Sequence, residues 1–256
     1  MSVSFLNSCS LGVNGGANPT ITTSPSGAGG TIAWLNVVLR TNAGVNKMFY
    51  GGSPATFIGS TTGGGGMRLS SWYFPDPPQS PCTMQACLST TALDLVFSVN
   101  YYKGVVTSSP IFGFNTSGNA GVGTVRNVSV SGVKVGTFLA DCMGTRSYAA
   151  SVGASVVGTA SAPQVERFES ESGGATECRS GTSDDAAPID ATMGWTLVEA
   201  AETGQIAVAL RAQASGKEVI WFMFRRAQES AQRRLLSWKT WWQWRQWARR
   251  DYGMAR

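Results

Sequence analysis

The chain has 256 residues, of which 31 are glycine, 43% are apolar, 14% are charged and none is histidine. This length suits one large or two small domains with a sizeable core, and the composition is too apolar for a disordered chain. The missing histidine excludes Ser-His-Asp and Cys-His nucleophile systems and any imidazole metal site. The low charge and the many glycines argue against a helical protein.

Short runs rich in β-branched and aromatic residues recur along the first 212 residues, and we predict that each forms a strand. The clearest is LDLVFSVNYY at residues 93–102, where apolar and polar residues alternate as in a half-buried strand. Trp34 and Trp195 are expected in the core. In chain order, the predicted strands cover residues 31–40, 67–74, 93–102, 125–133, 135–140, 164–169, 191–197 and 205–212.

Segments rich in Gly, Pro, Asn and Ser separate these runs. We predict loops or turns there, because Gly supplies positive φ, Pro fixes φ, and Asn or Asp caps the backbone locally. The segments are SPSGAGG, GGSPA, TTGGGG, PDPPQSP, NTSGNAG, ESGGATE and SGTSDDAAP. Regularly spaced short strands predict an all-β, antiparallel sandwich of jelly-roll type. No segment with helical periodicity precedes residue 226, which argues against a parallel α/β fold.

The composition changes near residue 212. Residues 1–212 hold 10 Lys/Arg and 12 Asp/Glu, whereas residues 213–256 hold 10 Lys/Arg, 3 Asp/Glu and six of the nine tryptophans. We therefore predict a β-sandwich domain at 1–212 and a basic, Trp-rich C-terminal helical extension at 213–256. Within the extension we expect a hinge at 213–217, a further strand at 218–226, and a helix at 227–252 that ends before Gly253.

Tryptophans cover most of the circumference of the predicted C-terminal helix, which leaves only a narrow polar stripe. Such a helix is expected to be buried on several sides or to mark an interface. The predicted partner-docking residues are Trp238, Trp241, Trp242, Arg245, Trp247 and Arg249, since Trp and Arg are enriched at binding hot spots.

Other uses of this helix stay open. It could lie on an anionic membrane surface, bind nucleic acid, or pack on its own sandwich. We favour docking on a partner because a membrane-surface helix keeps a broad charged face, and we place nucleic acid last.

Several segments resemble a known module in their serial order. In chain order they are TIAWLNVVLRTNAG, MFYGGSPATFIGSTTG, SSWYFPDPP, LDLVFSVNYYKGVVTSSPI, VKVGTFLADCMG and ATMGWTLVEAAETGQIAVALRAQ. Together they resemble the jelly-roll-like β-sandwich module found in structural proteins of tailed bacteriophages and in bacterial surface proteins. This resemblance covers about two thirds of the chain and implies a structural or binding module, not an enzyme. The C-terminal extension lies outside it.

Three aspartates, Asp184, Asp185 and Asp190, lie in a predicted Gly/Ser-rich loop. Clustered carboxylates could hold a hard cation such as calcium, or could form a glycosidase pair. We favour a solvated loop, because neither an EF-hand spacing nor a separate partner carboxylate is present. We therefore predict no catalytic set, no metal and no cofactor.

The aromatic run Trp72, Tyr73 and Phe74 could offer a platform for a sugar ring. Core packing is favoured, because at least one side of an alternating strand faces the core. Tyr73 is the candidate glycan contact within this run.

The N-terminus and the five cysteines bear on localisation. The first residues, MSVSFLNSCSLGV, lack the basic and apolar regions of a signal peptide, no run is long enough to span a bilayer, and an odd cysteine count favours reduced thiols. We expect a non-enzymatic structural protein of a phage-like virion, made in the host cytoplasm. It would be a capsid decoration, spike or tail-fibre protein, whose partners are other virion proteins or identical subunits. The alternative is a carbohydrate-binding module or adhesin that recognises a surface glycan.

Overall fold

A computed structural model describes the chain as two compact units, Ser2–Gln213 and a C-terminal unit that begins at Ala214. The described residues are 2–23, 29–40, 43–64, 66–119, 124–133, 137–146, 157–172, 178–186, 191–197 and 201–213, with ten more between 225 and 243.

The described part of Ser2–Gln213 is built from strands. They are β1 (Ser4–Gly16), β2 (Thr20–Thr23), β3 (Ile32–Arg40), β4 (Val45–Tyr50), β5 (Ser53–Pro54), β6 (Thr56–Thr62), β7 (Met67–Pro75), β8 (Cys82–Leu88), β9 (Ala92–Lys103), β10 (Ile111–Asn119), β11 (Val125–Ser129), β12 (Phe138–Arg146), β13 (Gly158–Ala160), β14 (Val165–Glu171), β15 (Cys178–Asp185), β16 (Thr192–Leu197) and β17 (Glu202–Leu210). The predicted all-β class is confirmed, and every predicted strand before residue 213 overlaps an observed one.

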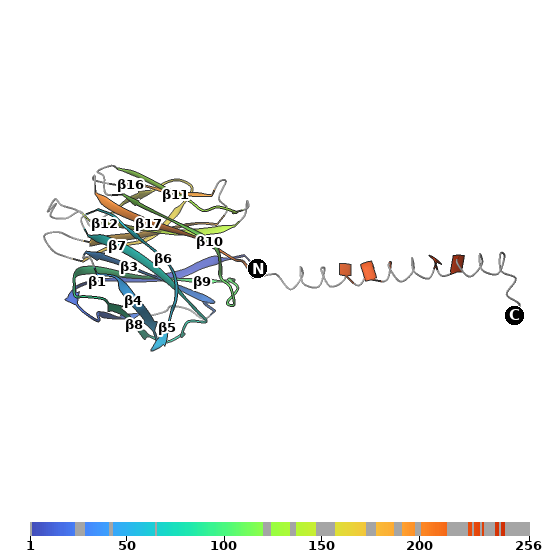
Figure 1. The fold of residues 1–256 in the computed structure, drawn as a ribbon, viewed down its shortest axis with the longest axis horizontal. Coiled ribbons are helices and arrows are strands. Elements are labelled where there is room, and N and C mark those ends of the chain that lie inside the picture. The colour runs from blue at the N-terminus through green and yellow to red at the C-terminus, as the bar shows by residue number, and fades with distance from the viewer. Residues whose placement is uncertain are drawn as a thin grey trace, which may run out of the picture. The chain divides into compact units, whose positions relative to one another are not determined.

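The strands form four antiparallel sheets. Strands β1-β9-β3-β7-β6 make the first inner sheet and β2-β8-β4-β5 the first outer sheet. Strands β10-β17-β12-β15-β14 make the second inner sheet and β11-β16-β13 the second outer sheet. Figure 1 shows these sheets as successive layers, from β8, β4 and β5 at one side to β16 and β11 at the other. The predicted sandwich is therefore four layers deep.

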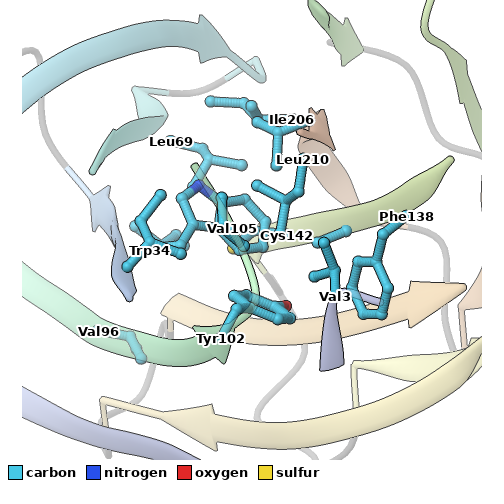
Figure 2. Packing of buried hydrophobic residues seen from close by; sticks show 14 of the residues in the cluster. Val3, Trp34, Leu69, Val96, Tyr102, Val105, Phe138, Cys142, Ile206 and Leu210 are labelled. Atoms are coloured by element: carbon cyan, nitrogen blue, oxygen red, sulfur yellow. The ribbon is translucent and has the colours of Figure 1, made fainter. Parts of the chain in front are cut away.

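Central strands of the inner sheets are buried on both faces because each inner sheet has a sheet on either side. Every residue of β3 and β12 except the last is buried. Successive residues of β3 point into two different cores. Trp34 packs between the two inner sheets, and Leu35 packs against the first outer sheet. Figure 2 shows the central core, with Trp34 from β3 and Cys142 from β12. The expected burial of Trp34 and Trp195 is confirmed, since both are fully buried.

The two halves of this unit repeat one strand order. When β1, β3, β7 and β9 of the first half are matched with β10, β12, β15 and β17 of the second, the order within each inner sheet is the same. The outer sheets agree too, because β2-β8-β4 matches β11-β16-β13. We call residues 2–103 the first half and residues 111–210 the second half.

The pairing registers extend this match to single residues. If Arg40 of β3 is matched with Arg146 of β12, their cross-strand partners are Asp94 and Glu202, and both pairs are ion pairs. Val38 is then equivalent to Gly144, and a Cβ placed on Gly144 would lie 2.9 Å from a methyl group of Val38. Equivalent positions therefore meet each other at the centre of the interface.

The contacts between the two halves follow an approximate two-fold symmetry. Strand β7 packs on β17 as β15 packs on β9, and β6 packs on β10 as β14 packs on β1. Such a reciprocal pattern is the isologous arrangement of a two-fold dimer, here within one chain.

Equivalent glycines allow the close approach at both ends of this interface. A side chain on Gly12 of β1 would meet the carbonyl oxygen of Glu171, at the end of β14. A side chain on Gly118 of β10 would meet the carbonyl oxygen of Thr62, at the end of β6. The registers place Gly12 opposite Val96 and Gly118 opposite Gly204, two residues beyond Asp94 and Glu202 respectively.

Two predicted loops are strands, which corrects the sequence analysis. SGTSDDAAP begins within β15, which is buried along its whole length between β12 and β14, and NTSGNAG begins within β10. Small polar residues fit here because they pack in narrow gaps: a Cβ on Gly181 would lie 2.9 Å from the ring of Trp195. Ladder pairing, on both sides of β15 and on one side of β10, therefore outweighs the turn propensity of Ser, Gly, Asn and Asp.

The C-terminal unit is helical at each of its described residues, all of which are exposed. Arg225 and Arg226, predicted as the end of a strand, are among them, which corrects that prediction. Arg225 pairs with Glu229 one turn later at 3.2 Å, a spacing that favours helix. The rest of the predicted strand at 218–226 lies outside the described residues.

Candidate functional site

A shallow hollow lies on the outward face of the first outer sheet, at the turn between β4 and β5. Its volume is about 410 Å³, and its lining residues are Phe49, Gly51, Gly52, Thr83 and Gln85. Phe49 of β4 and Gln85 of β8 are directly paired across the ladder. The hollow thus combines an aromatic ring, an amide, a hydroxyl group and bare backbone.

Strand alternation places these side chains on the outside. Met48 and Met84 point into the core between the first outer and first inner sheets. Because successive side chains of a strand face opposite ways, Phe49, Thr83 and Gln85 face outward. Phe49 and Gln85 are half-buried and Thr83 is exposed, so the ring and the amide are held in place but remain accessible.

The turn at the hollow depends on two glycines. Gly51 and Gly52 have φ of +57° and +81°, as the two-residue turn that best joins twisted strands requires. The Gly51 N–H donates to the Thr83 carbonyl at 2.9 Å, and the Ala55 N–H donates to the Met48 carbonyl at 2.8 Å. The first bond holds the turn against β8 and the second closes the hairpin onto β4, and together they fix one wall of the hollow.

A pair of tyrosines lies in the core behind the hollow. The hydroxyl groups of Tyr50 and Tyr101 are 2.5 Å apart, and that of Tyr50 lies 3.2 Å from the hydroxyl of Thr23. Burial raises the pKa of both phenols above the ordinary value. The phenols therefore stay protonated and tie β4 to β9, which stiffens the sheet that carries Phe49.

A buried carboxylate occupies the corresponding core of the second half. Asp141 of β12 is fully buried and accepts hydrogen bonds from Ser183 Oγ at 2.5 Å, Gln205 Nε2 at 2.6 Å and Trp195 Nε1 at 2.8 Å. Burial raises its pKa to about 6, although these three hydrogen bonds lower it. A group with three fixed partners and no exposure holds two sheets together rather than meeting a substrate.

The structure corrects the predicted acidic loop. Asp184 and Asp185 belong to β15 and are buried, and the Asp184 carboxylate accepts hydrogen bonds from Arg167 Nη2 at 2.6 Å and Nε at 2.7 Å. The solvated loop that the sequence analysis favoured is therefore wrong for these two residues. Asp190 lies outside the described residues. Within the described ranges, His, Cys, Asp and Glu side chains form no group of three suited to a metal ion.

The aromatic run in β7 packs largely as expected. Trp72 is buried and Phe74 half-buried against the core of the first outer sheet, while Tyr73 is half-buried against the central core. Tyr73 therefore lies on the other face of the first inner sheet from the hollow, and the structure does not bring it together with Phe49.

Sequence reasoning did not single out Phe49 or Gln85. The available signal was the GGSPA turn directly after VNKMFY, because a Gly-Gly turn marks a hairpin and the aromatic residues before it lie on opposite faces. Which of those faces stays open depends on what packs against the sheet, and the sequence does not state it.

One of the predicted docking residues is described. Trp242 is helical and its side chain is 50% exposed, an unusual state for so large an apolar group. Trp238, Trp241, Arg245, Trp247 and Arg249 lie outside the described residues.

Comparison with models of known protein families, with curated proteins and with solved structures yields no match to this chain. Of the helical residues that the structure describes, none belongs to a helix with the length and apolarity needed to cross a bilayer.

Proposed function

We propose that the protein is a non-enzymatic structural component of a bacteriophage-like virion, such as a capsid decoration, spike or tail-fibre protein. The observation that carries this proposal is the repeated strand order of the two halves, joined through a reciprocal interface. The two halves have the same strand order and pack on each other, and a fold that can pack on a copy of itself suits an assembly of repeated subunits.

We further propose that each half is a jelly roll. An eight-stranded jelly roll places strands 1, 8, 3 and 6 in one sheet and 2, 7, 4 and 5 in the other. With β6 as an added edge strand, the first half follows this order through β1-β9-β3-β7 and β2-β8-β4-β5. The described strands of the second half fill seven of the eight positions. Jelly rolls recur in viral capsid and lectin domains, which supports a structural or binding role.

In this proposal a C-terminal helix at 227–252 anchors the sandwich to other virion proteins or identical subunits. The exposed Trp242 supports the idea, because Trp is enriched among the residues that dominate binding energy. The excess of basic residues after 213 would add long-range attraction to an acidic partner surface.

Truncation after Gln213 tests the anchor. The four cores lie within Ser2–Gln213, so the truncated protein should keep the far-ultraviolet β spectrum and the cooperative unfolding of the full chain. Assembly, measured by sedimentation and negative-stain microscopy, should be lost. In the full chain, Trp242→Ser should weaken assembly, whereas Gln243→Ser, its exposed helical neighbour, should not. Full assembly of the truncated protein would refute the anchor.

The second candidate is a carbohydrate-binding module or adhesin. The hollow at Phe49 favours it, rather than Tyr73 or the acidic residues of β15.

A further inference from the structure

We propose that the hollow lined by Phe49, Gly51, Gly52, Thr83 and Gln85 is a binding subsite for a neutral pyranose sugar. This inference does not depend on the virion proposal, since a sugar site could serve either a host-recognition protein of a particle or a free adhesin.

The aromatic ring gives the first part of the argument. Phe49 is half-buried beside the hydroxyl group of Thr83 and the amide of Gln85, so its ring offers a fixed apolar plane next to hydrogen-bonding groups. The C–H face of a pyranose is apolar while its rim is hydroxylated, and a ring bordered by polar groups complements both.

The polar groups of the hollow can both donate and accept. The Gln85 side chain carries a carbonyl oxygen and an NH₂ group, and the Thr83 hydroxyl does both through one atom. Sugar hydroxyl groups are likewise donors and acceptors. Gln85 lies directly across from Phe49 on the neighbouring strand, so its amide sits where the hydroxylated rim of a sugar stacked on that ring would lie.

Gly52 leaves room for the ligand. A Cβ placed on Gly52 would meet no heavy atom within 4 Å, so the backbone at the turn opens onto free space. Positive φ disfavours any side chain at Gly51 and Gly52. The bonds from the turn to Thr83 and Met48 make this wall rigid, which lowers the entropic cost of binding a small ligand.

Charge and size define the ligand class. None of the five lining residues is ionisable, and Lys47 is the one charged residue in the strands of the first outer sheet. A phosphate, nucleotide or acidic peptide would find no cation among the described residues that line the hollow. The volume of about 410 Å³ lies at the lower end of small-molecule sites and accommodates one or two sugar rings.

The test uses the full chain on an array of glycans that end in neutral hexoses or N-acetylhexosamines, with uronic-acid and sialic-acid glycans as separate arms. Ligand-observed NMR titration of the best monosaccharide follows. We expect binding of a neutral sugar with a Kd of about 1 mM, because a shallow hollow buries little of a single ring. Phe49→Ala should weaken binding about tenfold or more, and Phe49→Trp, with its larger ring, should strengthen it several-fold.

Gln85→Ala should also weaken binding, through lost hydrogen bonds. The matched control is Phe57→Ala, because Phe57 is a 55% exposed phenylalanine on β6, outside the hollow. It should leave the Kd unchanged. Thermal unfolding of each variant separates misfolding from loss of the site, and Phe49→Trp keeps the test valid if Phe49→Ala unfolds. Three outcomes would overturn the proposal: the absence of binding at millimolar sugar, binding of acidic glycans alone, or a Kd that neither change at Phe49 alters.

Discussion

The two halves of the sandwich share one strand order but bury different chemistry. Between its inner and outer sheets, the first half places an apolar core with the hydroxyl pair of Tyr50 and Tyr101. At the matching interface, the second half places the carboxylate of Asp141, with Trp195 as one of its donors. One topology therefore tolerates a neutral or an ionisable core, provided that each buried polar group finds hydrogen-bond partners.

The halves also differ on their outward faces. The first outer sheet presents Phe49 beside Gln85 in a hollow. Among the described residues of the second outer sheet, the exposed side chains are aliphatic or polar, such as Val125, Asn127 and Thr196. The difference indicates that strand order specifies the scaffold, whereas the proposed sugar subsite depends on side chains that the described residues place on the first half.

The largest expected effect concerns the equivalent glycines of the interface. Gly12→Val and Gly118→Val should each lower the free energy of unfolding by about 3 kcal/mol or more, since the new side chain would meet a backbone carbonyl that cannot rotate away. Urea unfolding of the two variants measures this.

The control for the glycines is Gly30→Ala, whose new Cβ would make only ordinary contacts of 3.5 Å and 3.8 Å. It should change stability by no more than about 0.5 kcal/mol. Strong destabilisation by one of the two valine changes alone would show that the interface is not two-fold in its energetics.

The second prediction concerns the ionisable core. Burial raises the folded-state pKa of Asp141 from near 3.8 to about 6, so the folded protein holds this proton more tightly than the unfolded chain does. Its contribution to stability is therefore largest below pH 4 and is lost as pH rises through 6. Between pH 4.5 and 7.5 the loss amounts to about 2 kcal/mol.

Asp141→Asn removes this proton and keeps the size of the side chain. The difference in unfolding free energy between wild type and variant should change by that amount over the same pH range, as followed by chemical denaturation at several pH values. Tyr50→Phe is the comparison from the first half and should show no such pH dependence below pH 8, because burial keeps its phenol protonated. Parallel pH profiles for wild type and Asp141→Asn would contradict the prediction.

The smallest effect separates the two equivalent ion pairs. Arg40 and Asp94 approach to 2.9 Å with a hydrogen bond, whereas Arg146 and Glu202 are 3.7 Å apart. A double-mutant cycle with alanine at each pair should give a coupling of about 1 kcal/mol for the first and a few tenths for the second. Added salt should reduce the first coupling. A larger coupling in the second half would show that distance does not rank these pairs.

Much of the strand content could be predicted from local patterns. β3 and β9 carry runs of β-branched and aromatic residues, so their position was predicted within a residue or two. β15 was missed because its sequence, CRSGTSDD, has the composition of a loop. It is a strand because β12 and β14 pair with it on both sides, a relation between segments that no local pattern records.

At the candidate site, too, local sequence predicts one part and contacts between distant segments decide the other. The Gly51–Gly52 turn is visible in the sequence, since adjacent glycines after an alternating run predict a hairpin. Which side of that hairpin stays open depends on the first inner sheet, which covers Met48 and Tyr50 and leaves Phe49 outside. The prediction for the acidic residues was wrong because it considered only their polar sequence neighbours. In the structure, Arg167, 17 residues before Asp184, pairs with the Asp184 carboxylate and allows it to be buried.

The sequence by itself determined that this chain is an antiparallel β protein without histidine chemistry and with a basic, tryptophan-rich end, because composition and alternation are local properties. Only the tertiary structure decided that the sandwich has four layers and that its halves repeat one topology. It also showed that Gly12 and Gly118 occupy equivalent positions, where each allows two strands to approach closely. These features depend on which strands lie side by side. For strands rich in small and polar residues, such as β15, the neighbouring strands are far away in sequence. The local pattern of side chains does not identify those neighbours.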